Sequence, residues 1–397
     1  MTKSDDKRVP VLRFKGFTDE WEQRKLLDIL EQPVTDGPHE TPNLVKKGIP
    51  FISAEAIINN QIDFSKKRGY ISVEYNKQCN KKYAPKIYDV YMVKSGSTVG
   101  KVAILETSRI FNIWSPLAAM RVNHKNSPYF LYYLLQTDML QEQTQNKSKG
   151  GTQPNLSMRV LEKFSTYYTN VEEEEKIANL LKVVDKLISL QQRKLRQLKL
   201  LKNVLLKRMF TAKKSPTLRF RDFSKDWKLH KLQDITDRLD NARVPVTASK
   251  RIAGSTPYYG ANGIQDYVKG YTHDGEFLLV AEDGANNIND YPVICAKGKI
   301  WVNNHAHVLQ AKNKKIDILF LMYALKFLNM KKYLVGGGRS KLNAETMMKL
   351  ALKLPELDEE HNIGVLIKNM DVLITQYKYR IQKINKFKQF LLQNMFI

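Results

Sequence analysis

The first functional site that the residues suggest is a phosphate-binding loop. Residues 96–101 read GSTVGK, whereas a nucleotide-binding P-loop needs a glycine, four residues, and then Gly-Lys followed by Ser or Thr. That spacing would begin at Ser95, and Val102 stands where the metal-binding hydroxyl should be. We therefore predict no ATP site here, but a turn that exposes polar side chains to a phosphate backbone. The polar side chains of this turn are those of Lys94, Ser97, Thr98 and Lys101.

Other groups able to bind a metal or catalyse a reaction are isolated in the sequence. His305 and His307 would share one face of a strand, but no cysteine or acidic cluster accompanies them, so we expect hydrogen-bonding roles. Four glutamates at 172–175 fit a helix start better than a nuclease, whose two-metal site needs carboxylates from several elements. Cys79 and Cys295 support neither a disulfide framework nor a zinc site. We predict no catalytic residue, no metal and no cofactor in this chain.

The composition indicates a polyanionic partner. The chain has 65 Lys and Arg against 40 Asp and Glu, a formal net charge of +25. Such a basic protein attracts nucleic acid or an anionic membrane surface. We find neither a spanning apolar segment nor the apolar core of a signal peptide at the N-terminus, so we expect a cytoplasmic, nucleic-acid-binding protein.

The sequence contains an internal repeat. Residues 10–29 read PVLRFKGFTDEWEQRKLLDI, and residues 216–235 read PTLRFRDFSKDWKLHKLQDI. A second pair of similar segments lies at 150–188 and 336–374. Each begins with Gly-Gly, continues to a leucine, and ends in a segment with acidic residues followed by periodic apolar residues. Each half ends on Met-Phe, at 209–210 and 395–396. The order is variable domain, helix, variable domain, helix. This order predicts one repeated scaffold that carries two domains of different recognition specificity.

Two long helices are predicted, at 172–209 and about 358–395. Asn170 is the expected N-cap of the first, with Glu173 three positions later. If helical throughout, the first segment would be roughly 57 Å long at ~1.5 Å per residue. Its apolar stripe contains Ile177, Leu180, Val184, Leu187, Leu198, Leu201 and Leu205, widened by Leu181, Ile188, Leu195 and Met209. The second stripe contains Ile363, Leu366, Met370, Leu373, Tyr377, Ile384, Phe387 and Leu391. We expect an antiparallel coiled coil, the alternative being that each helix covers its own domain.

The variable regions predict mixed α/β domains. Strand-like runs lie at 48–52, 90–93, 101–105 and 277–280, and turns rich in Gly, Asn and Ser lie at 94–97 and 283–287. Each region also carries a short helical stretch, at 129–136 and 319–327. The fold class is therefore α+β, with two mixed domains, two long helices and a pseudo-twofold repeat.

Several of these segments together resemble the specificity subunits of type I restriction–modification systems. They are the opening pattern LRF..F...W....L.DI, the run GKIWVNNHAHVL at 298–309, and the loops GGTQPNL at 150–156 and GGGRSKL at 336–342. The first half matches more loosely, with Trp114-Ser115-Pro116-Leu117 standing where Trp301-Val302-Asn303-Asn304 would be. The resemblance covers essentially the whole chain.

This resemblance implies a non-catalytic subunit that binds double-stranded DNA. Two target-recognition domains, at 1–155 and 215–340, would each read half of an asymmetric bipartite site. Spacer helix regions, at 156–214 and 341–397, would set the gap and dock two methyltransferase subunits. Nuclease–translocase subunits would complete the complex. S-adenosylmethionine, ATP and magnesium would be bound by these partners, and no membrane is involved.

Polar loop residues of the two domains are the expected DNA contacts, because base edges and phosphates are read by such groups. In the first domain these are Lys94, Ser97, Thr98, Lys101, Gln153 and Asn155; in the second they are Asn286, Asn287, Arg339, Ser340 and Lys341. For each of them, a role in a solvated turn is the alternative. We expect Asn303, Asn304 and His305 to be buried and hydrogen-bonded within their domain.

Two other functions remain open from sequence. The chain could be a stand-alone DNA-binding regulator or antagonist without enzymatic partners, which co-purification with a methyltransferase would test. It could also be a nucleic-acid enzyme with an unfamiliar site, which incubation of the pure protein with DNA, S-adenosylmethionine, ATP and magnesium would test.

Overall fold

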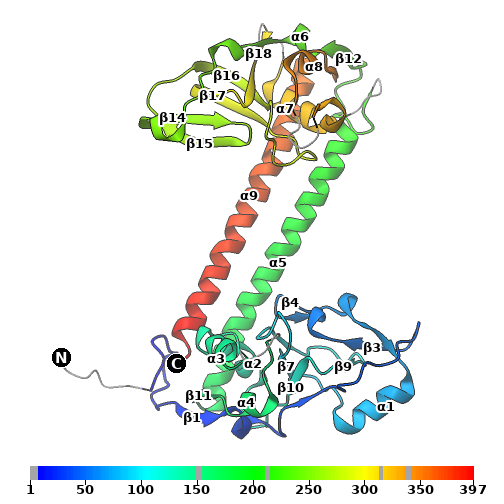
Figure 1. Ribbon diagram of the computed structural model, residues 1–397, viewed down its shortest axis with the longest axis vertical. Helices are drawn as coiled ribbons and strands as arrows, with labels where there is room; N and C mark the ends of the chain where they lie inside the picture. The colour runs from blue at the N-terminus through cyan, green and yellow to red at the C-terminus, as the bar shows by residue number, and fades with distance from the viewer. Residues whose placement is uncertain (1–7, 149–153, 211–214, 313–315, 337–340) are drawn as a thin grey trace, which may run out of the picture. The chain divides into compact units, whose positions relative to one another are not determined.

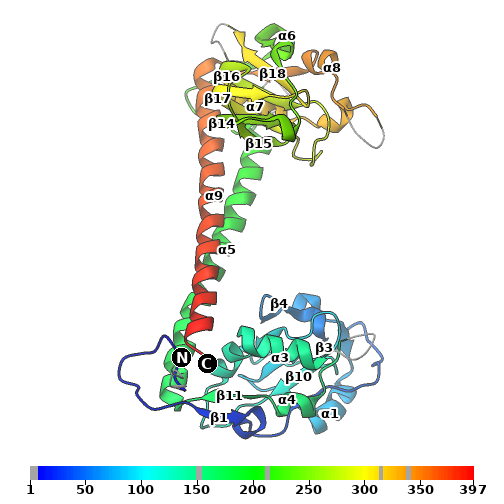
Figure 2. The ribbon, with the colours of Figure 1, turned by 60° about the vertical axis from the view of Figure 1, so that its left-hand side comes forward.

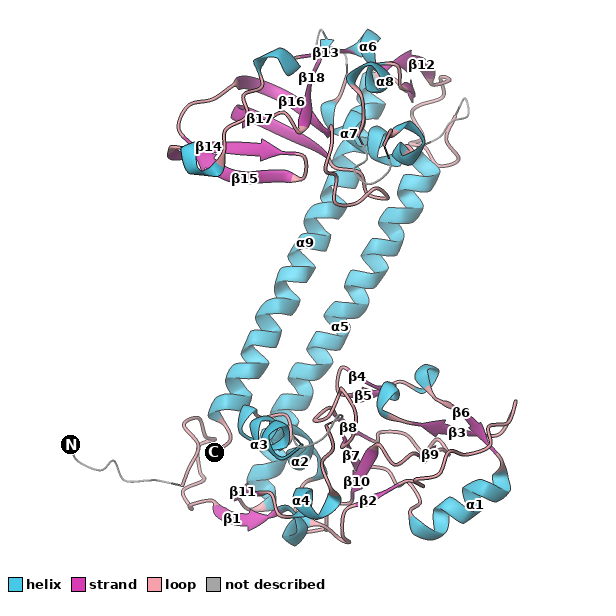
Figure 3. Cartoon of the chain, viewed as in Figure 1, coloured by secondary structure: helices cyan, strands magenta, loops and turns pink. Residues whose placement is uncertain are grey.

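The chain forms two compact units. The computed structural model describes residues 8–148, 154–210, 215–312, 316–336 and 341–397 (Figure 1). The first unit contains Met1–Gln191 and Arg380–Ile397, and the second contains Gln192–Tyr379. Each unit therefore combines a globular part with segments of both long helices. Helices and strands are mixed within each globular part (Figure 3), as the predicted α+β class requires.

The two long helices are α5 (Val171–Met209) and α9 (Leu357–Asn394), close to the predicted limits. Helix α5 begins where Asn170 Oδ1 accepts a hydrogen bond from the N–H of Glu173 at 2.9 Å, as the N-cap prediction required. Acidic residues occupy the first turn of both helices and favour the positive end of the helix dipole. None of the described helices is long and apolar enough to cross a membrane.

The first unit builds its globular part from short strands. They are β1 (Glu22–Lys25), β2 (Thr35–Asp36), β3 (Ile49–Ile52), β4 (Ile57–Ile58), β5 (Gln61–Ile62), β6 (Gly69–Ile71), β7 (Val90–Val93), β8 (Val102–Ile104), β9 (Asn112–Ile113), β10 (Leu117–Met120) and β11 (Ser165–Tyr168). The main sheets have the orders β2-β10-β7-β8 and β6-β3-β9, and β1 pairs with β11 and β4 with β5. The helices are α1 (Val73–Lys82), α2 (Pro128–Leu134), α3 (Asp138–Ser148) and α4 (Met158–Glu162). The strand and helix predictions at 48–52, 90–93, 101–105 and 129–136 are confirmed.

The second unit is organised around one larger sheet of order β13-β18-β16-β17-β14-β15 (Figure 2). Its strands are β12 (Lys228–Lys231), β13 (Thr236–Arg238), β14 (Ala253–Gly260), β15 (Gly263–Val268), β16 (His273–Ala281), β17 (Val293–Val302), β18 (Ala306–Ala311) and β19 (Ala351–Leu354). The short helices are α6 (Leu232–Ile235), α7 (Ile318–Phe327) and α8 (Ala344–Met348). Strand β16 and helix α7 confirm the predictions at 277–280 and 319–327.

The helix ends complete the cores of the units. In the first unit Phe396, just after α9, packs 5.1 Å from the ring of Phe130, which lies 5.7 Å from Trp21. In the second unit Phe210, just after α5, packs 5.2 Å from Phe320, and Trp227 lies 5.6 Å from that ring. Each half of the sequence thus contributes its final phenylalanine to the unit formed mainly by the other half.

The predicted apolar stripes are only partly correct. Leu187 and Leu201 of α5 are 44% and 48% exposed, while Leu181 and Ile188 are buried. In α9, Leu373 and Phe387 are likewise exposed, and the buried positions include Ile367 and Ile374. The buried Ile, Leu and Val positions of α5 follow alternating steps of four and three residues: Ile177, Leu181, Val184 and Ile188. The buried residue in the last step is therefore Ile188, one position after the predicted Leu187.

Contacts between α5 and α9 are present inside each unit. Lys388 Nζ lies 2.8 Å from Asp185 Oδ1 in the first unit, and Lys202 Nζ lies 2.5 Å from Asp371 Oδ1 in the second. Tyrosine hydroxyls donate to the same carboxylates, from Tyr133 at 3.0 Å and from its counterpart Tyr323 at 2.8 Å. Pairing along the full length of the helices as a coiled coil stays a prediction.

Candidate nucleic-acid interface

The two globular parts share one backbone hydrogen-bonding frame. The N–H of Leu156 donates to the carbonyl of Lys94, which follows β7, at 2.7 Å. The N–H of Leu342 donates to the carbonyl of Glu282, which follows β16, also at 2.7 Å. Lys94 and Glu282 therefore occupy equivalent positions. The loops that follow them, and the loops before α4 and α8, are the places where DNA contacts were predicted.

The same frame corrects the alignment of the central strands. The N–H groups of the two equivalent residues donate to the carbonyls of Pro116 and His305, at 2.8 and 2.9 Å. Counting back from these acceptors places Trp114 at the position of Asn303, so the alignment of Trp114 with Trp301 is wrong by two residues. Two tryptophans at similar places in weakly related segments produced the wrong register.

A buried carboxylate supports the interface loops of the first unit. Asp36, at the end of β2, is fully buried, and its Oδ2 lies 3.3 Å from Lys94 Nζ and 3.0 Å from His39 Nε2. Lys82 of α1 donates to the other oxygen, Oδ1. Removing one partner from such a buried ion pair is strongly destabilising, because it leaves an uncompensated charge. The pair therefore fixes the start of the loop that follows β7.

The equivalent position in the second unit is occupied by a different charge network. Asp240 accepts a hydrogen bond from the N–H of Val308 at 2.8 Å and lies 2.7 Å from His307 Nδ1. Burial opposes ionisation of Asp240, but these hydrogen bonds outweigh it and keep its pKa below the ordinary value. Arg243 Nη1 lies 2.7 Å from Glu282, on which Lys341 Nζ also converges at 2.9 Å.

Of the residues predicted in the first unit, Lys94 is not exposed as expected. Its side chain is buried against Asp36, an acid distant in the sequence that the prediction could not place beside it. Ser97 and Lys101 are exposed and Thr98 is half-buried, and the three line a groove of about 650 Å³.

The other two predicted positions of this unit lie before α4. Asn155 is exposed, and its N–H donates to the carbonyl of Ser148 at 3.1 Å. Gln153 lies outside the described residues.

The predicted residues of the second unit lie in or beside a turn. The N–H of Asn286 donates to Asn262 Oδ1 at 2.9 Å, and Asn287 Oδ1 accepts from two backbone N–H groups that follow it, at 2.9 and 3.1 Å. Both asparagines are exposed, so their side-chain amides also face solvent. Lys341 is exposed but is paired with Glu282. Arg339 and Ser340 lie outside the described residues.

The histidine motif has the structural role predicted for it. His307 is buried, and its Nε2 lies 2.9 Å from the carbonyl of Leu342. Asn303 is also buried, and its Oδ1 accepts from the N–H of His305 at 2.9 Å. The expectation that Asn304 and His305 are buried is wrong: Asn304 lies at the exposed tip of the turn before β18, and His305 is half-buried, with its Nδ1 2.5 Å from Asp283 Oδ1. In the described part of the chain, no three His, Cys, Asp or Glu side chains gather as metal ligands would.

The acidic run at the start of α5 has a function that sequence reasoning missed. Glu173 is buried and binds Arg13 through two hydrogen bonds of 2.7 and 2.8 Å, so its carboxylate does not reach back to the N-cap. Glu174 accepts from the N–H of Ser127 at 2.6 Å and from Asn126 Nδ2 at 2.9 Å. Burial raises the pKa of Glu174 to about 7. The helix start therefore anchors α5 to its globular part.

The second long helix repeats this anchor. Arg219 donates two hydrogen bonds of 2.7 Å to Glu359, and Glu360 accepts from the N–H of Asp317 at 2.8 Å. The duplicated LRF segments and the acidic helix starts were both visible in the sequence, and their co-occurrence in each half was the available signal for this pairing.

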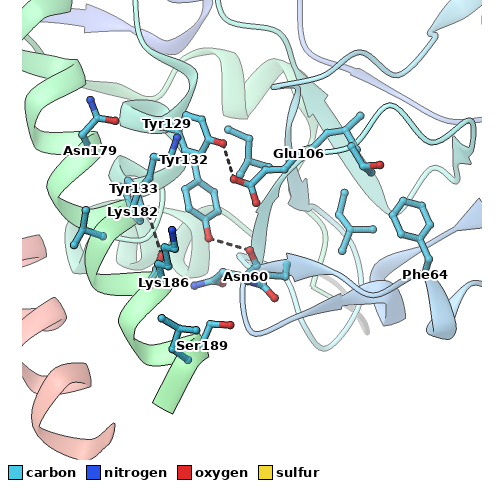
Figure 4. Close-up of a pocket in the computed structure, with 18 residues that line it drawn as sticks. Asn60, Phe64, Glu106, Tyr129, Tyr132, Tyr133, Asn179, Lys182, Lys186 and Ser189 are labelled. Atoms are coloured by element: carbon cyan, nitrogen blue, oxygen red, sulfur yellow. Dashed lines mark hydrogen bonds between the residues drawn. The ribbon is translucent and has the colours of Figure 1, made fainter. Parts of the chain in front are cut away.

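A groove of about 820 Å³ lies beside α5 in the first unit (Figure 4). On its walls Tyr129 donates to Glu106 at 2.6 Å, and Tyr132 donates to the carbonyl of Asn60 at 2.9 Å. Lys182 Nζ lies 3.6 Å from the ring centroid of Tyr129. The groove also exposes apolar side chains of α5 that lie off the buried stripe, among them Val183 and Leu190.

Comparison with known proteins gives a family match over both halves. The sequence model of the family described as the type I restriction modification DNA specificity domain matches residues 18–200 and 224–386. A Haemophilus influenzae protein named as a type I restriction enzyme specificity subunit is 41% identical over 151 residues, an alignment that spans 38% of either chain. A Methanocaldococcus jannaschii protein named as the MjaX specificity subunit is 24% identical, over 94% of this chain and 91% of its own.

Solved structures share the fold. The crystal structure of the S subunit of a type I restriction–modification system from M. genitalium has a TM-score of 0.69 and 17% identity, covering 98% of this chain and 99% of its own. A chain from a structural study of the assembly and conformational transition of the type I system has a TM-score of 0.53 and 14% identity, covering 94% of this chain and 96% of its own.

Proposed function

The chain belongs to the family of type I restriction–modification DNA specificity proteins, and from this membership we propose how it reads DNA. Each unit binds one half of an asymmetric bipartite site. The observation that carries this proposal is the shared backbone frame with different loops on it: residues 95–101 follow Lys94 in one unit, and residues 283–292 follow the equivalent Glu282 in the other. Equivalent scaffolds with different polar groups would select different bases.

The proposed mechanism separates affinity from specificity. The excess of Lys and Arg supplies a sequence-independent attraction to phosphates, which weakens as salt rises. Exposed polar residues on the loops of the shared frame supply base contacts. Our candidates with exposed side chains are Ser97, Lys101, Asn155, Asn286 and Asn287. The buried pairs at Asp36 and Asp240 position these loops, and they do not themselves contact DNA.

We further propose that the chain performs no chemistry and that its partners do. Two methyltransferase subunits carrying S-adenosylmethionine would dock on the helix regions, and nuclease–translocase subunits carrying ATP and magnesium would join them in the cytoplasm. Exposed apolar residues on α5, including Leu187 and Leu190, support such docking, because unpaired apolar helix surface favours a partner. The helices would set the gap between half-sites.

Co-expression with a type I methyltransferase subunit from the same source tests the function. Methylated adenines are then mapped genome-wide, with cells lacking this chain as the control. We expect a single split motif that disappears in the control. A stable complex without methylation would instead indicate a regulator, and methylation or cleavage by the pure chain alone would contradict a non-catalytic role.

A further inference from the structure

Two arginines of the first unit lie over aromatic rings instead of pairing with carboxylates. Arg68 Cζ is 3.9 Å from the ring centroid of Trp114, and Arg109 Cζ is 4.6 Å from that of Phe64. Both arginines are exposed. In the described ranges, neither guanidinium makes an ion pair or a hydrogen bond, whereas Arg121 of the same unit is held by Asp89 at 2.8 Å. Their N–H edges are therefore free for a ligand.

The ring beneath Arg68 is held in place by its surroundings. Trp114 Nε1 donates to the carbonyl of Glu40 at 3.1 Å. Gly37 packs so closely on this segment that a Cβ there would lie 1.9 Å from the carbonyl oxygen of Ile113 and 2.8 Å from Trp114 Cα. A guanidinium stacked on a fixed ring loses little conformational freedom on binding, which is the condition for strong planar recognition.

Three consecutive cations lie between two aromatic residues in the segment that carries Arg68. Residues 64–70 read FSKKRGY, and Lys67 Nζ lies 4.8 Å from the ring of Tyr70. Lys46 and Lys47 are exposed on the neighbouring segment of the same chain, where Val45 pairs with Tyr70. Basic side chains interleaved with aromatic rings are typical of surfaces that bind nucleic acid. An exposed cation–aromatic contact contributes little to folding stability. Stability alone therefore does not explain why the neighbouring residues Lys67 and Arg68 both make such contacts.

We propose that Arg68 and Arg109 contact DNA in the half-site read by the first unit. This inference rests on the proposed function and adds residues that the loop-based candidates omit. A planar guanidinium with free N–H donors matches either two phosphate oxygens or the O6 and N7 acceptors of guanine.

The test uses the complex of the full chain with its methyltransferase subunit. Arg68→Gln and Arg109→Gln remove one charge each, and Arg68→Lys keeps the charge but loses the planar fork. Arg8→Gln is the matched control, because Arg8 is exposed in the same unit, lies outside the candidate loops and the spacer helix regions, and its substitution removes the same charge. Affinity for duplex DNA is measured against salt, and methylated motifs are mapped. We expect the Gln variants to bind roughly 5- to 150-fold more weakly than the control, and Arg68→Lys to recover only part of the loss.

The result also distinguishes the two sources of the contact. A phosphate contact would weaken binding equally for all sequences and lower the salt dependence by about one ion. A base contact would weaken binding only to the target and relax the methylated motif at one position of one half. Either result supports the proposal. Variants that bind and methylate like Arg8→Gln, with unchanged thermal midpoints, would overturn it while leaving the proposed function intact. A wild-type complex that neither binds DNA nor methylates would overturn both.

Discussion

Replacing Glu360 by Gln should stabilise the second unit and remove part of its pH dependence. Burial raises the pKa of Glu360 to about 8, from an ordinary value of 4.5. Between these values the folded protein holds a proton that the unfolded chain has released, so the free energy of unfolding falls as pH rises. At ~1.4 kcal/mol per pH unit, the loss between pH 4.5 and pH 7 is at most about 3 kcal/mol. Glutamine resembles the protonated form and still offers an oxygen to the N–H of Asp317.

Urea unfolding at pH 5, 6, 7 and 8 measures this effect. The wild-type free energy of unfolding should fall across the series relative to Glu360→Gln, and the variant should be the more stable protein at pH 7. Glu359→Gln is the control, because it breaks the ion pair with Arg219 and should destabilise the unit by about 3–5 kcal/mol. Parallel pH profiles for wild type and Glu360→Gln, or a variant less stable at pH 7, would refute the reasoning.

Three further predictions concern the cores, the buried pair and the helices. Phe396→Ala should destabilise the first unit by about 3–5 kcal/mol, and Phe210→Ala should destabilise the second by a similar amount, because both rings are buried. Denaturant unfolding measures both losses. A single variant that destabilised both units equally would contradict the assignment of its phenylalanine to one unit. Lys94→Met should lower stability by about 1–3 kcal/mol, because the buried Asp36 loses one cationic partner and keeps Lys82 and His39. Thermal unfolding would detect the loss, and a neutral result would show that Lys82 and His39 alone compensate the charge of Asp36. Inserting whole turns into the middle of α5 and the matching part of α9 should lengthen the gap in the methylated motif and leave both half-sites unchanged, whereas an unchanged gap would refute the spacer role.

The long helices were predictable because their signals are local. Acidic first turns and sustained apolar periodicity define α5 and α9 within their own residues, and α5 also has Asn170 as its N-cap. The prediction that Leu187 and Leu201 are buried was wrong. Apolar residues lie on both sides of the stripe in α5, so the sequence alone does not show which of them face the partner surface. Helices α1 and α3 were missed, since neither carries a strong apolar stripe in its sequence.

The candidate site was less predictable because it depends on residues distant in the chain. Lys94 looked like an exposed loop lysine, and only the fold brings Asp36 against it. The equivalence of Lys94 with Glu282 is likewise invisible in sequence, since the two residues share a backbone position and not a side chain. The basic and aromatic residues around Arg68 were visible in the sequence, but only the fold places Trp114 beneath this arginine.

The exchange of terminal phenylalanines has a consequence for synthesis on the ribosome. Trp21 and Phe130 are translated early, but Phe396, which packs on both rings, follows the whole second unit in the sequence. At roughly 5–20 residues per second, the residues from Arg380 onward emerge on the order of 10–40 s after α5 begins to appear. The second unit needs nothing beyond Tyr379, so it can close before the first. Of the two units, the one that begins to be translated first is therefore the later to complete its core, and the apolar surface around Trp21 and Phe130 stays uncovered by Phe396 while the second unit is made.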